Sequence, residues 1–400
     1  MDRKQKRKII FLLGIISALG PFSVDMYLSG FPAIAKDLQT DIEHVALTLT
    51  SYFIGISFGQ LVYGPLLDRY GRKKPLSAGL LIYFVAAIGC AVSPSINSLI
   101  ALRLLLALGG CVGMVAGRAI VRDLFEPHEI VKVFSLLMLV ISVSPVVAPT
   151  VGGIITDTFG WRLIFILLAT ISAVIVLVVV RLLPESKGPD KSVIINPKSI
   201  FVEYIKVLKI PEFYIYAVAS GMLSAGLFTY ISEAPFIIMN FFGFSEIQFG
   251  WIFAVNAMGL VISSQLNHIL IKKSTSENIV VVCGLLMFLT GIILILYNLI
   301  FTNNAIILFS LIFVYLFWLG ILNPNAAALV LKPFTKNVGS ASALLGSVQM
   351  LSGSIASAIV SRFHNGTTFP ITCLMAGWAA LFLLIILGGR YFIKLEYAVE

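Results

Sequence analysis

Twelve apolar runs, most of them about twenty residues long, follow one another along the chain. A run of this length crosses the hydrocarbon core of a bilayer as one helix, and soluble cores do not contain so many. Only 12% of the residues are Asp, Glu, Lys or Arg, and the mean hydropathy is +1.00. The chain is therefore predicted to span a membrane at about residues 9–31, 46–67, 75–93, 98–120, 133–156, 163–183, 212–236, 248–271, 278–300, 305–330, 338–361 and 369–389.

The predicted fold is all-α. A backbone in lipid must satisfy its own N–H and C=O groups, and the alternating pattern of a barrel strand does not appear. The longest polar interruption, residues 184–211, separates six spans from six. Tyr27-Leu-Ser-Gly-Phe-Pro and Gln60-Leu in the first half are matched at near-equal spacing by Tyr230-Ile-Ser-Glu-Ala-Pro and Gln265-Leu in the second. We therefore expect two pseudo-symmetric six-helix bundles, 1–183 and 212–400, joined by a cytoplasmic linker at 184–211.

The positive charges predict the orientation. With a cytoplasmic N-terminus, 24 of the 28 Lys and Arg residues lie in cytoplasmic segments. Lys36, Arg162 and Arg362 lie outside, and Arg103 lies within a span. This asymmetry follows the positive-inside rule, so both termini are expected in the cytoplasm and the protein in the inner membrane. The basic residues of the cytoplasmic segments account for the net charge of +9. The sequence has no separate basic domain, so a nucleic-acid partner is not expected.

The turn between spans two and three reads Gly64-Pro-Leu-Leu-Asp-Arg-Tyr-Gly-Arg-Lys-Lys. Topogenic charges alone explain its basic residues, but they do not explain Asp68 or the glycines. The turn resembles the loop signature of the major facilitator superfamily. That resemblance implies a conformational latch, in which Asp68 faces the N-terminal dipole of span eleven while the cytoplasmic side is closed. Its expected members, including Asp123 as a partner for Arg69 or Arg72, are Gly64, Asp68, Arg69, Gly71, Arg72 and Asp123.

Span five carries Ser144-Pro-Val-Val-Ala-Pro-Thr-Val-Gly-Gly. Generic kinks and close packing are one interpretation of two prolines and a glycine pair. The run also resembles the antiporter signature of drug-efflux branches, carried here by Pro145, Ala148, Pro149, Gly152 and Gly153. Together with Asp25-Met-Tyr-Leu-Ser-Gly-Phe-Pro, Arg118-Ala-Ile-Val-Arg-Asp and Gly160-Trp-Arg, it is similar to the Bcr/CflA group of multidrug transporters. Ser29, Leu106 and Glu233 depart from that group's pattern.

Ionisable residues inside spans are costly, so Asp25, Arg103 and Glu233 are the candidates for proton coupling. Asp25 and Arg103 both fall roughly 8–9 Å below the outer surface, so they are expected at the same depth. A carboxylate stays ionised beside an arginine and takes up a proton when it is desolvated, so a conformational change that alters either effect can make Asp25 bind or release a proton. A static Asp25–Arg103 pair is the structural alternative. Glu233 is predicted either as an exposed rim carboxylate or as a second coupling or cation-binding group.

Aromatic and amide residues inside the spans are the candidates for lining a substrate cavity. Aromatic pockets with few polar anchors accept varied apolar ligands, although Trp and Tyr also occupy membrane interfaces. The set is Tyr27, Tyr52, Tyr230, Trp251, Asn256, Trp318, Asn323, Asn325 and Gln349.

These patterns predict a transporter that exports drug-like molecules in exchange for protons. A proton-coupled transporter of a metabolite is the alternative within the same fold. An integral-membrane enzyme is a distant one, because the four histidines have no metal-ligand spacing and no nucleophile motif appears. No cofactor and no metal are expected, since no phosphate-binding loop is present and the proton gradient supplies the energy. The expected partners are a small-molecule substrate, protons and membrane lipid, and the functional unit is expected to be a monomer.

Overall fold

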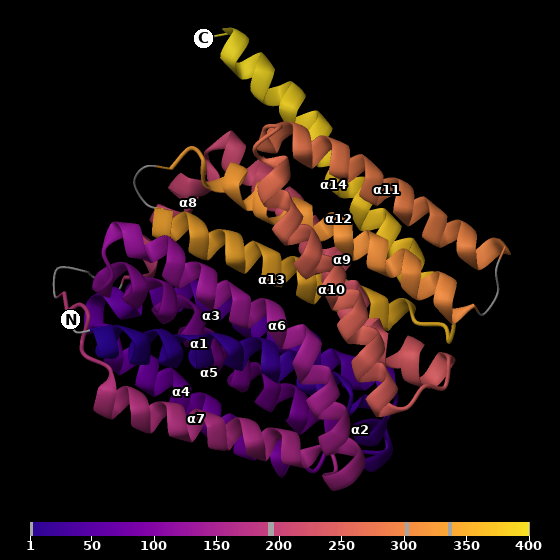
Figure 1. Ribbon diagram of the computed structural model, residues 1–400, viewed down its shortest axis with the longest axis horizontal. Coiled ribbons are helices and arrows are strands. Elements are labelled where there is room, and N and C mark those ends of the chain that lie inside the picture. Colours follow the sequence, from indigo (N-terminus) through magenta and orange to yellow (C-terminus); the bar gives the residue numbers. More distant parts are fainter. Residues whose placement is uncertain (1–2, 191–195, 301–303, 335–337, 400) are drawn as a thin grey trace. The chain divides into compact units, whose positions relative to one another are not determined.

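The computed structural model describes residues 3–190, 196–300, 304–334 and 338–399, and every regular element in these ranges is a helix (Figure 1). Twelve of these helices are long and apolar enough to cross a membrane, which confirms the predicted fold class. The first six are α1 (Arg3–Leu28), α3 (Ile42–Tyr70), α4 (Lys73–Ala91), α5 (Ile96–Leu124), α6 (Pro127–Phe159) and α7 (Arg162–Leu182). The other six are α9 (Pro211–Pro235), α10 (Glu246–Leu270), α11 (Ser276–Ile300), α12 (Ala305–Leu331), α13 (Val338–Phe363) and α14 (Phe369–Val399).

Three shorter elements were not anticipated. Helix α2 (Phe31–Asp37) follows the first span and has Pro32 in its first turn, where the proline ring fits a helix. Helix α8 (Pro197–Leu208) lies within the segment predicted as a linker. The π-helical turn η1 (Phe236–Phe241) continues α9 beyond Pro235, where proline interrupts the regular backbone hydrogen bonding.

The chain divides into two compact units. Unit 1 comprises residues 1–200 and 246–251, and unit 2 comprises residues 201–245 and 252–400. The structural boundary therefore falls inside α8 and assigns the start of α10 to unit 1, whereas the sequence predicted bundles at 1–183 and 212–400.

Helices in unit 1 pack α1 against α6, α4 against both α5 and α7, and α3 against α5 (Figure 1). Small residues permit the closest approach. A Cβ atom on Gly109 of α5 would lie 2.5 Å from the backbone nitrogen of Tyr83 and 2.7 Å from the carbonyl oxygen of Gly79, both on α4. Contacts of this kind are the usual means of helix association in lipid.

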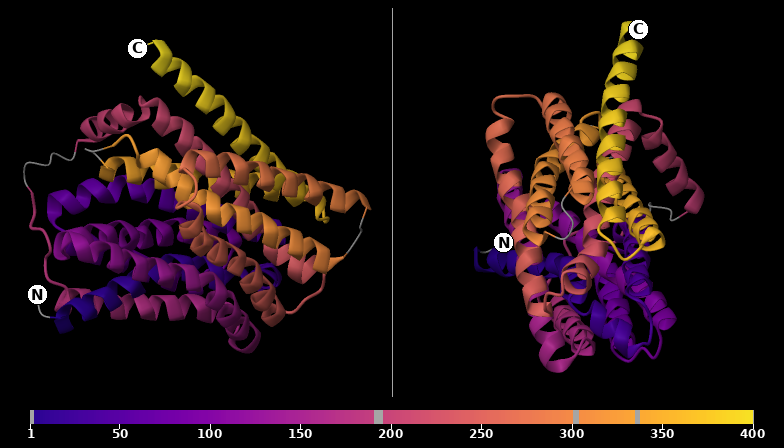
Figure 2. Two further views of the ribbon diagram at one scale, coloured as in Figure 1. Left: turned by 45° about the horizontal axis from the view of Figure 1, so that its top comes forward. Right: turned by 90° about the vertical axis from the view of Figure 1, so that its right-hand side faces the viewer.

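Unit 2 repeats much of this arrangement. Helix α9 packs against α13 as α1 does against α6, and α11 packs against α12 and α14 as α4 does against α5 and α7. The equivalent contacts support the internal repeat expected from the matched sequence segments. The last turns of α14 extend beyond the other helices of unit 2 (Figures 1 and 2).

Candidate functional site

Asp25 lies in the last turn of α1 and is buried, with 5% of its surface exposed. Among the described residues it makes neither a hydrogen bond nor an ion pair. No described cation therefore neutralises the charge of this carboxyl group. It is therefore a structural candidate for binding a proton.

Arg103 of α5 is completely buried and lies between two aromatic rings. Its guanidinium carbon is 4.4 Å from the ring centre of Tyr27 and 4.3 Å from that of Tyr52. Its Nη1 donates a hydrogen bond of 2.9 Å to the carbonyl oxygen of Ser23, whereas Nε and Nη2 have no hydrogen-bond partner in the described part of the chain. The structure thus holds a buried cation by ring faces and one carbonyl group.

Asp25 and Arg103 do not form an ion pair in the described structure. Ser23 and Tyr27 lie one turn apart on α1 and both contact Arg103, whereas Asp25 is two residues from each. Successive helical residues are rotated by about 100°, so Asp25 points about 200° away from these two residues. The shared depth predicted from the sequence does not bring the groups together, and the static pair offered as an alternative is not observed.

The two tyrosines near Arg103 have different partners. The Tyr27 hydroxyl is 2.9 Å from Thr48 Oγ1, which itself donates to the backbone of α3. Tyr52 is a buried residue of α3, and its hydroxyl lies 3.4 Å from the carbonyl oxygen of Gly20. Both predicted cavity residues therefore surround the buried arginine of unit 1.

The cavity candidates of unit 2 fall into separate small groups. Asn256 Nδ2 donates to the Tyr230 hydroxyl at 3.1 Å, and the Tyr230 ring stacks on Phe253 at 5.5 Å. Gln349 Nε2 lies 2.7 Å from Ser220 Oγ and 3.4 Å from Asn323 Oδ1.

Three further candidates lie apart from these groups. Asn325 is buried and donates to Asn267 Oδ1 at 2.7 Å. Trp318 is half-buried beside Phe317, and Trp251 exposes 63% of its surface. This exposure is unusual for a pocket anchor and common for an interfacial tryptophan.

Glu233 is not an exposed rim carboxylate, because only 5% of its surface is accessible. Its Oε2 lies 3.3 Å from Nδ1 of His364, which follows the last residue of α13. The sequence singled out the acid, but it gave His364 no role.

The predicted latch residues meet at Arg72, just before α4. Its Nη1 is 2.7 Å from Asp68 Oδ1, and its Nε is 2.8 Å from Asp123 Oδ2. Burial acts to lower the pKa of Arg72, but hydrogen bonds to Asp123 and Asp68 reverse this effect and raise it. Arg72 therefore stays charged and ties the end of α3 to the end of α5. Arg69 belongs to the last turn of α3, and Gly64 has open space beside its Cα.

Glu185 is a member of this cluster that the sequence did not reveal. Its Oε1 accepts hydrogen bonds from the backbone N–H of Arg72 at 2.6 Å and of Lys73 at 3.2 Å. A carboxylate here complements the N-terminal dipole of α4. Gly71 makes room for it, because Gly71 has φ of +84° and a Cβ there would lie 3.1 Å from the Glu185 carboxylate. Glu185 directly follows Pro184 at the end of the sixth span, which is the only local signal of this contact.

The span-five motif lies in α6, which continues through both prolines. Ala148 is fully buried, and Pro149 is buried while Pro145 is half-buried. A Cβ on Gly152 would collide with the Met26 carbonyl oxygen of α1, and one on Gly153 would lie 2.6 Å from the Glu246 carbonyl oxygen. The motif therefore permits close backbone packing.

A second polar cluster lies at the opposite ends of the unit 1 helices. Asp37 of α2 accepts hydrogen bonds from Arg162 and from Trp161 Nε1. Arg162 also donates to the Ser93 carbonyl oxygen at 3.2 Å, beyond the end of α4. The hydrogen bond from Arg162 lowers the pKa of Asp37 below its ordinary value. The Gly160-Trp-Arg sequence thus joins three helix ends.

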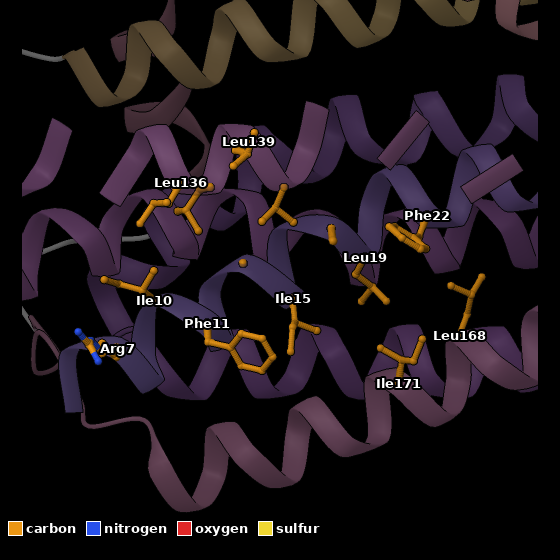
Figure 3. A pocket seen from close by; sticks show the side chains of 14 residues that line it. Arg7, Ile10, Phe11, Ile15, Leu19, Phe22, Leu136, Leu139, Leu168 and Ile171 are labelled. Carbon is orange, nitrogen blue, oxygen red and sulfur yellow. The ribbon is translucent and has the colours of Figure 1, made fainter. Parts of the chain in front are cut away.

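Figure 3 shows an apolar cavity in unit 1, between α1, α6 and α7. Its volume is about 570 Å³, and Arg7 is the one charged side chain among its described lining residues. Phe11, Leu19 and Phe22 contribute to the wall from α1. None of the predicted coupling or substrate residues lines it. These described lining residues suit hydrocarbon and include no carboxyl group for proton exchange.

Comparison with known proteins places this geometry in context. The sequence model of the Major Facilitator Superfamily matches residues 13–357. The MFS-type transporter YdgK of Bacillus subtilis is 34% identical, over 93% of this chain and 92% of its own length. The bicyclomycin resistance protein homolog of Haemophilus influenzae is 31% identical, over 92% of this chain and 93% of its own length. The chloramphenicol resistance protein of Pseudomonas aeruginosa is 28% identical, over 90% of this chain and 86% of its own length.

Solved structures show the same fold at low sequence identity. An inward-facing bacterial homolog of the human lysosomal transporter Spinster superposes with a TM-score of 0.76 at 14% identity, over 98% of this chain and 99% of that chain. The D-xylose-proton symporter superposes with a TM-score of 0.73 at 16% identity, over 94% of this chain and 96% of that chain.

Proposed function

The chain belongs to the major facilitator superfamily, and from this premise we propose that it exports small drug-like or amphipathic compounds in exchange for protons. It is a multi-pass membrane transporter of the Bcr/CflA type, as the sequence resemblance predicted, and not an enzyme. Relatives named for resistance to bicyclomycin and to chloramphenicol support drug export. The motif in α6 supports antiport.

The observation that carries the proton-coupling proposal is Asp25. It is a buried carboxyl group in a membrane-spanning helix, with no hydrogen bond or ion pair among the described residues. Such a group is costly to keep in lipid unless it has a function. Arg103 of α5 lies against another face of α1 and supplies a fixed positive charge to unit 1.

The proposed cycle alternates access to the two sides of the membrane. Asp25 takes up a proton when its site opens to the outside, and it releases the proton when the site opens to the cytoplasm and its surroundings become more polar. The substrate moves in the opposite direction, because the loaded and empty forms favour different conformations. The aromatic side chains Tyr27, Tyr52 and Tyr230 are proposed as part of the substrate site, with the amides of Asn256, Asn323 and Gln349 as its polar anchors.

The remaining assignments follow from the same proposal. The protein lies in the inner membrane with both termini in the cytoplasm, as the distribution of Lys and Arg indicates. The proton gradient is the energy source, so the cycle requires no cofactor. A single chain contains both bundles, so a monomer suffices for the cycle.

The test is transport into everted membrane vesicles by wild type and Asp25→Asn. We expect wild type to accumulate bicyclomycin or chloramphenicol when the vesicle lumen is acidic, and we expect Asp25→Asn to lose this accumulation, because the amide does not titrate. The amount of inserted protein is measured by immunoblotting of the same vesicles. Full gradient-driven accumulation by Asp25→Asn would remove Asp25 from the mechanism, and accumulation that is indifferent to the gradient in wild type would refute antiport.

A further inference from the structure

The carboxyl group of Glu233 and the imidazole of His364 meet inside unit 2. Glu233 Oε2 and His364 Nδ1 are 3.3 Å apart, and the two side chains expose only 7% and 9% of their surfaces. Ser232, the neighbour of Glu233, is joined to Ser357 of α13 by a hydrogen bond of 2.8 Å. The acid on α9 is thus held against the end of α13, where the histidine lies.

The loop after α13 is built to hold His364 in this place. Asn365 Oδ1 accepts hydrogen bonds from the backbone N–H and the hydroxyl of Thr367, and Gly366 has φ of +76°. The hydroxyl of Thr368 then donates to Asn298 Oδ1 of α11 at 2.5 Å. The loop is therefore anchored to a neighbouring helix directly after the histidine, which limits the movement of the imidazole ring.

The pair also lies at a break in a helix. Pro235 ends the regular part of α9, and the chain continues as the π-helical turn η1. The ring of Phe236, the first residue of η1, packs edge-on against the imidazole of His364 at 4.1 Å between ring centres. A change in the position of His364 would therefore act directly on the point where α9 changes its geometry.

The described surroundings contain few competing charges. Helices α12, α13 and α14 pack against α9 together with η1. Within their described residues, the other charged group at this end is Arg362, which lies exposed in the last turn of α13. The other titratable groups in this half of these helices are the Tyr230 phenol of α9, which accepts from Asn256, the Tyr315 phenol of α12, which donates to the Met375 carbonyl oxygen, and the Cys373 thiol of α14.

We propose that Glu233 and His364 form a second proton-binding site, located in unit 2 and separate from Asp25. The inference rests on the proposed function, because it assigns this proton to the same transport cycle. With one proton the pair is neutral, either as carboxylate and imidazolium or as carboxylic acid and imidazole. Loss of that proton leaves a buried negative charge, and gain of another leaves a buried positive charge, so both changes are costly while the pair is closed.

The cycle of this site follows from that charge balance. The pair takes up one proton when its end of unit 2 opens to the outside, which is the end remote from Lys332 and Arg390. Closure then buries a neutral pair. The proton leaves once the site opens to the cytoplasm. Because the pair adjoins the break at Pro235, a change in its protonation can change the shape of α9.

The proton site is tested first without substrate, by NMR titration of histidine-labelled protein in detergent. The chain has four histidines, so the His364 signal is assigned by its loss in His364→Gln. We expect Glu233→Gln to move the His364 midpoint to lower pH by about one unit or more, because an adjacent carboxylate favours imidazolium. Arg362→Gln, at the exposed end of α13, is the matched control and should move the His364 midpoint by only a few tenths of a pH unit. An unchanged midpoint in Glu233→Gln overturns the site.

The role in transport is tested by the pH dependence of bicyclomycin export in proteoliposomes across about pH 5 to 8. We expect Glu233→Gln and His364→Gln each to flatten this dependence severalfold, while Arg362→Gln, the control of the titration, keeps the wild-type profile. Wild-type profiles in both variants would overturn the coupling role even if the NMR result is positive. Absence of proton-driven export in wild type would refute the proposed function instead, and the titration would still decide the proton site.

Discussion

Arg103 is the largest side chain among those that the described structure buries completely. A guanidinium group is planar and stacks on aromatic rings, whereas an ammonium group is a compact point charge. The stacking of Arg103 on Tyr27 and Tyr52 therefore depends on the shape of the arginine as well as on its charge. The sequence suggested that Arg103 matters because it contacts Asp25. In the structure its stacking on the two tyrosines is the reason.

Arg103→Lys should consequently lower the initial rate of proton-driven export by about tenfold or more, because each lost ring contact is worth roughly 0.5–2 kcal/mol. The measurement is the initial rate in everted vesicles, corrected for the amount of inserted protein. Arg122→Lys, the same substitution at an exposed arginine in the last turn of α5, serves as the control and should leave the rate unchanged. An unchanged rate in Arg103→Lys would show that positive charge alone is sufficient.

The pair of Asp37 and Arg162 gives a residue-scale prediction about pH. Since the folded state lowers the pKa of Asp37, the pair contributes stability above the unfolded value of about 3.9 and loses it as the pH falls through the lower folded pKa. The Asp37 side chain is 44% exposed, so solvent screening limits the contribution to a few tenths of a kcal/mol.

Asp37→Asn should therefore melt slightly below wild type at neutral pH, and the two melting temperatures should converge below about pH 4. Thermal unfolding in detergent at both pH values checks this expectation. Asp157→Asn, a change at an exposed carboxylate near the end of α6, is the control and should have no effect. A difference that persists in acid would indicate that the Asp37 carboxylate is not the cause.

The packing between neighbouring helices determines which substitutions each helix tolerates. Gly109 lies where the backbones of α5 and α4 are in contact, whereas Gly14 of α1 lines the apolar cavity in Figure 3. A methyl group on Gly109 would meet backbone atoms of Tyr83 and Gly79, which move only if the helices separate. A methyl group on Gly14 would find Val140 Cγ2 at 3.7 Å, an ordinary contact distance.

The same substitution should therefore have opposite effects at these two sites. Gly109→Ala is expected to destabilise by about 1–3 kcal/mol through overpacking. Gly14→Ala should stabilise by about 0.5–1 kcal/mol, because alanine has the higher helix propensity. Thermal unfolding of the two variants in detergent measures the difference. Equal effects at both positions would contradict the packing of α4 on α5.

At the scale of the whole molecule, the cluster around Arg72 is the candidate for controlling the conformational cycle. Unit 1 supplies two carboxylates to one arginine, and Glu185 fixes the backbone at the start of α4. Under the latch hypothesis, Asp68 also attracts the N-terminal dipole of α13 while the cytoplasmic side is closed. Removal of this charge leaves Arg72 paired with Asp123, so the fold of unit 1 should persist.

Asp68→Asn is accordingly expected to shift the population toward the inward-open state by severalfold, since a helix-terminus interaction is worth roughly 0.3–2 kcal/mol. Distances between spin labels at the C-terminal end of α3 and the N-terminal end of α13 report the shift. Asp41→Asn, at the other end of α3, is the control. A label-distance distribution that does not change in Asp68→Asn would rule out the latch.

The sequence by itself determined the solvent, the helical class and the number of spans, because hydropathy and the cost of bare backbone in lipid act on each segment independently. It also identified Asp25, Arg103 and Glu233, because any ionisable residue in an apolar run is conspicuous.

Tertiary structure alone decided which of these residues meet. Depth along a helix follows from residue number, but contact also requires rotation about the helix axis and the placement of neighbouring helices. For this reason Arg103 contacts Ser23 and Tyr27 and not Asp25. For the same reason Glu233 finds a histidine 131 positions away, in a loop that no hydropathy pattern marks.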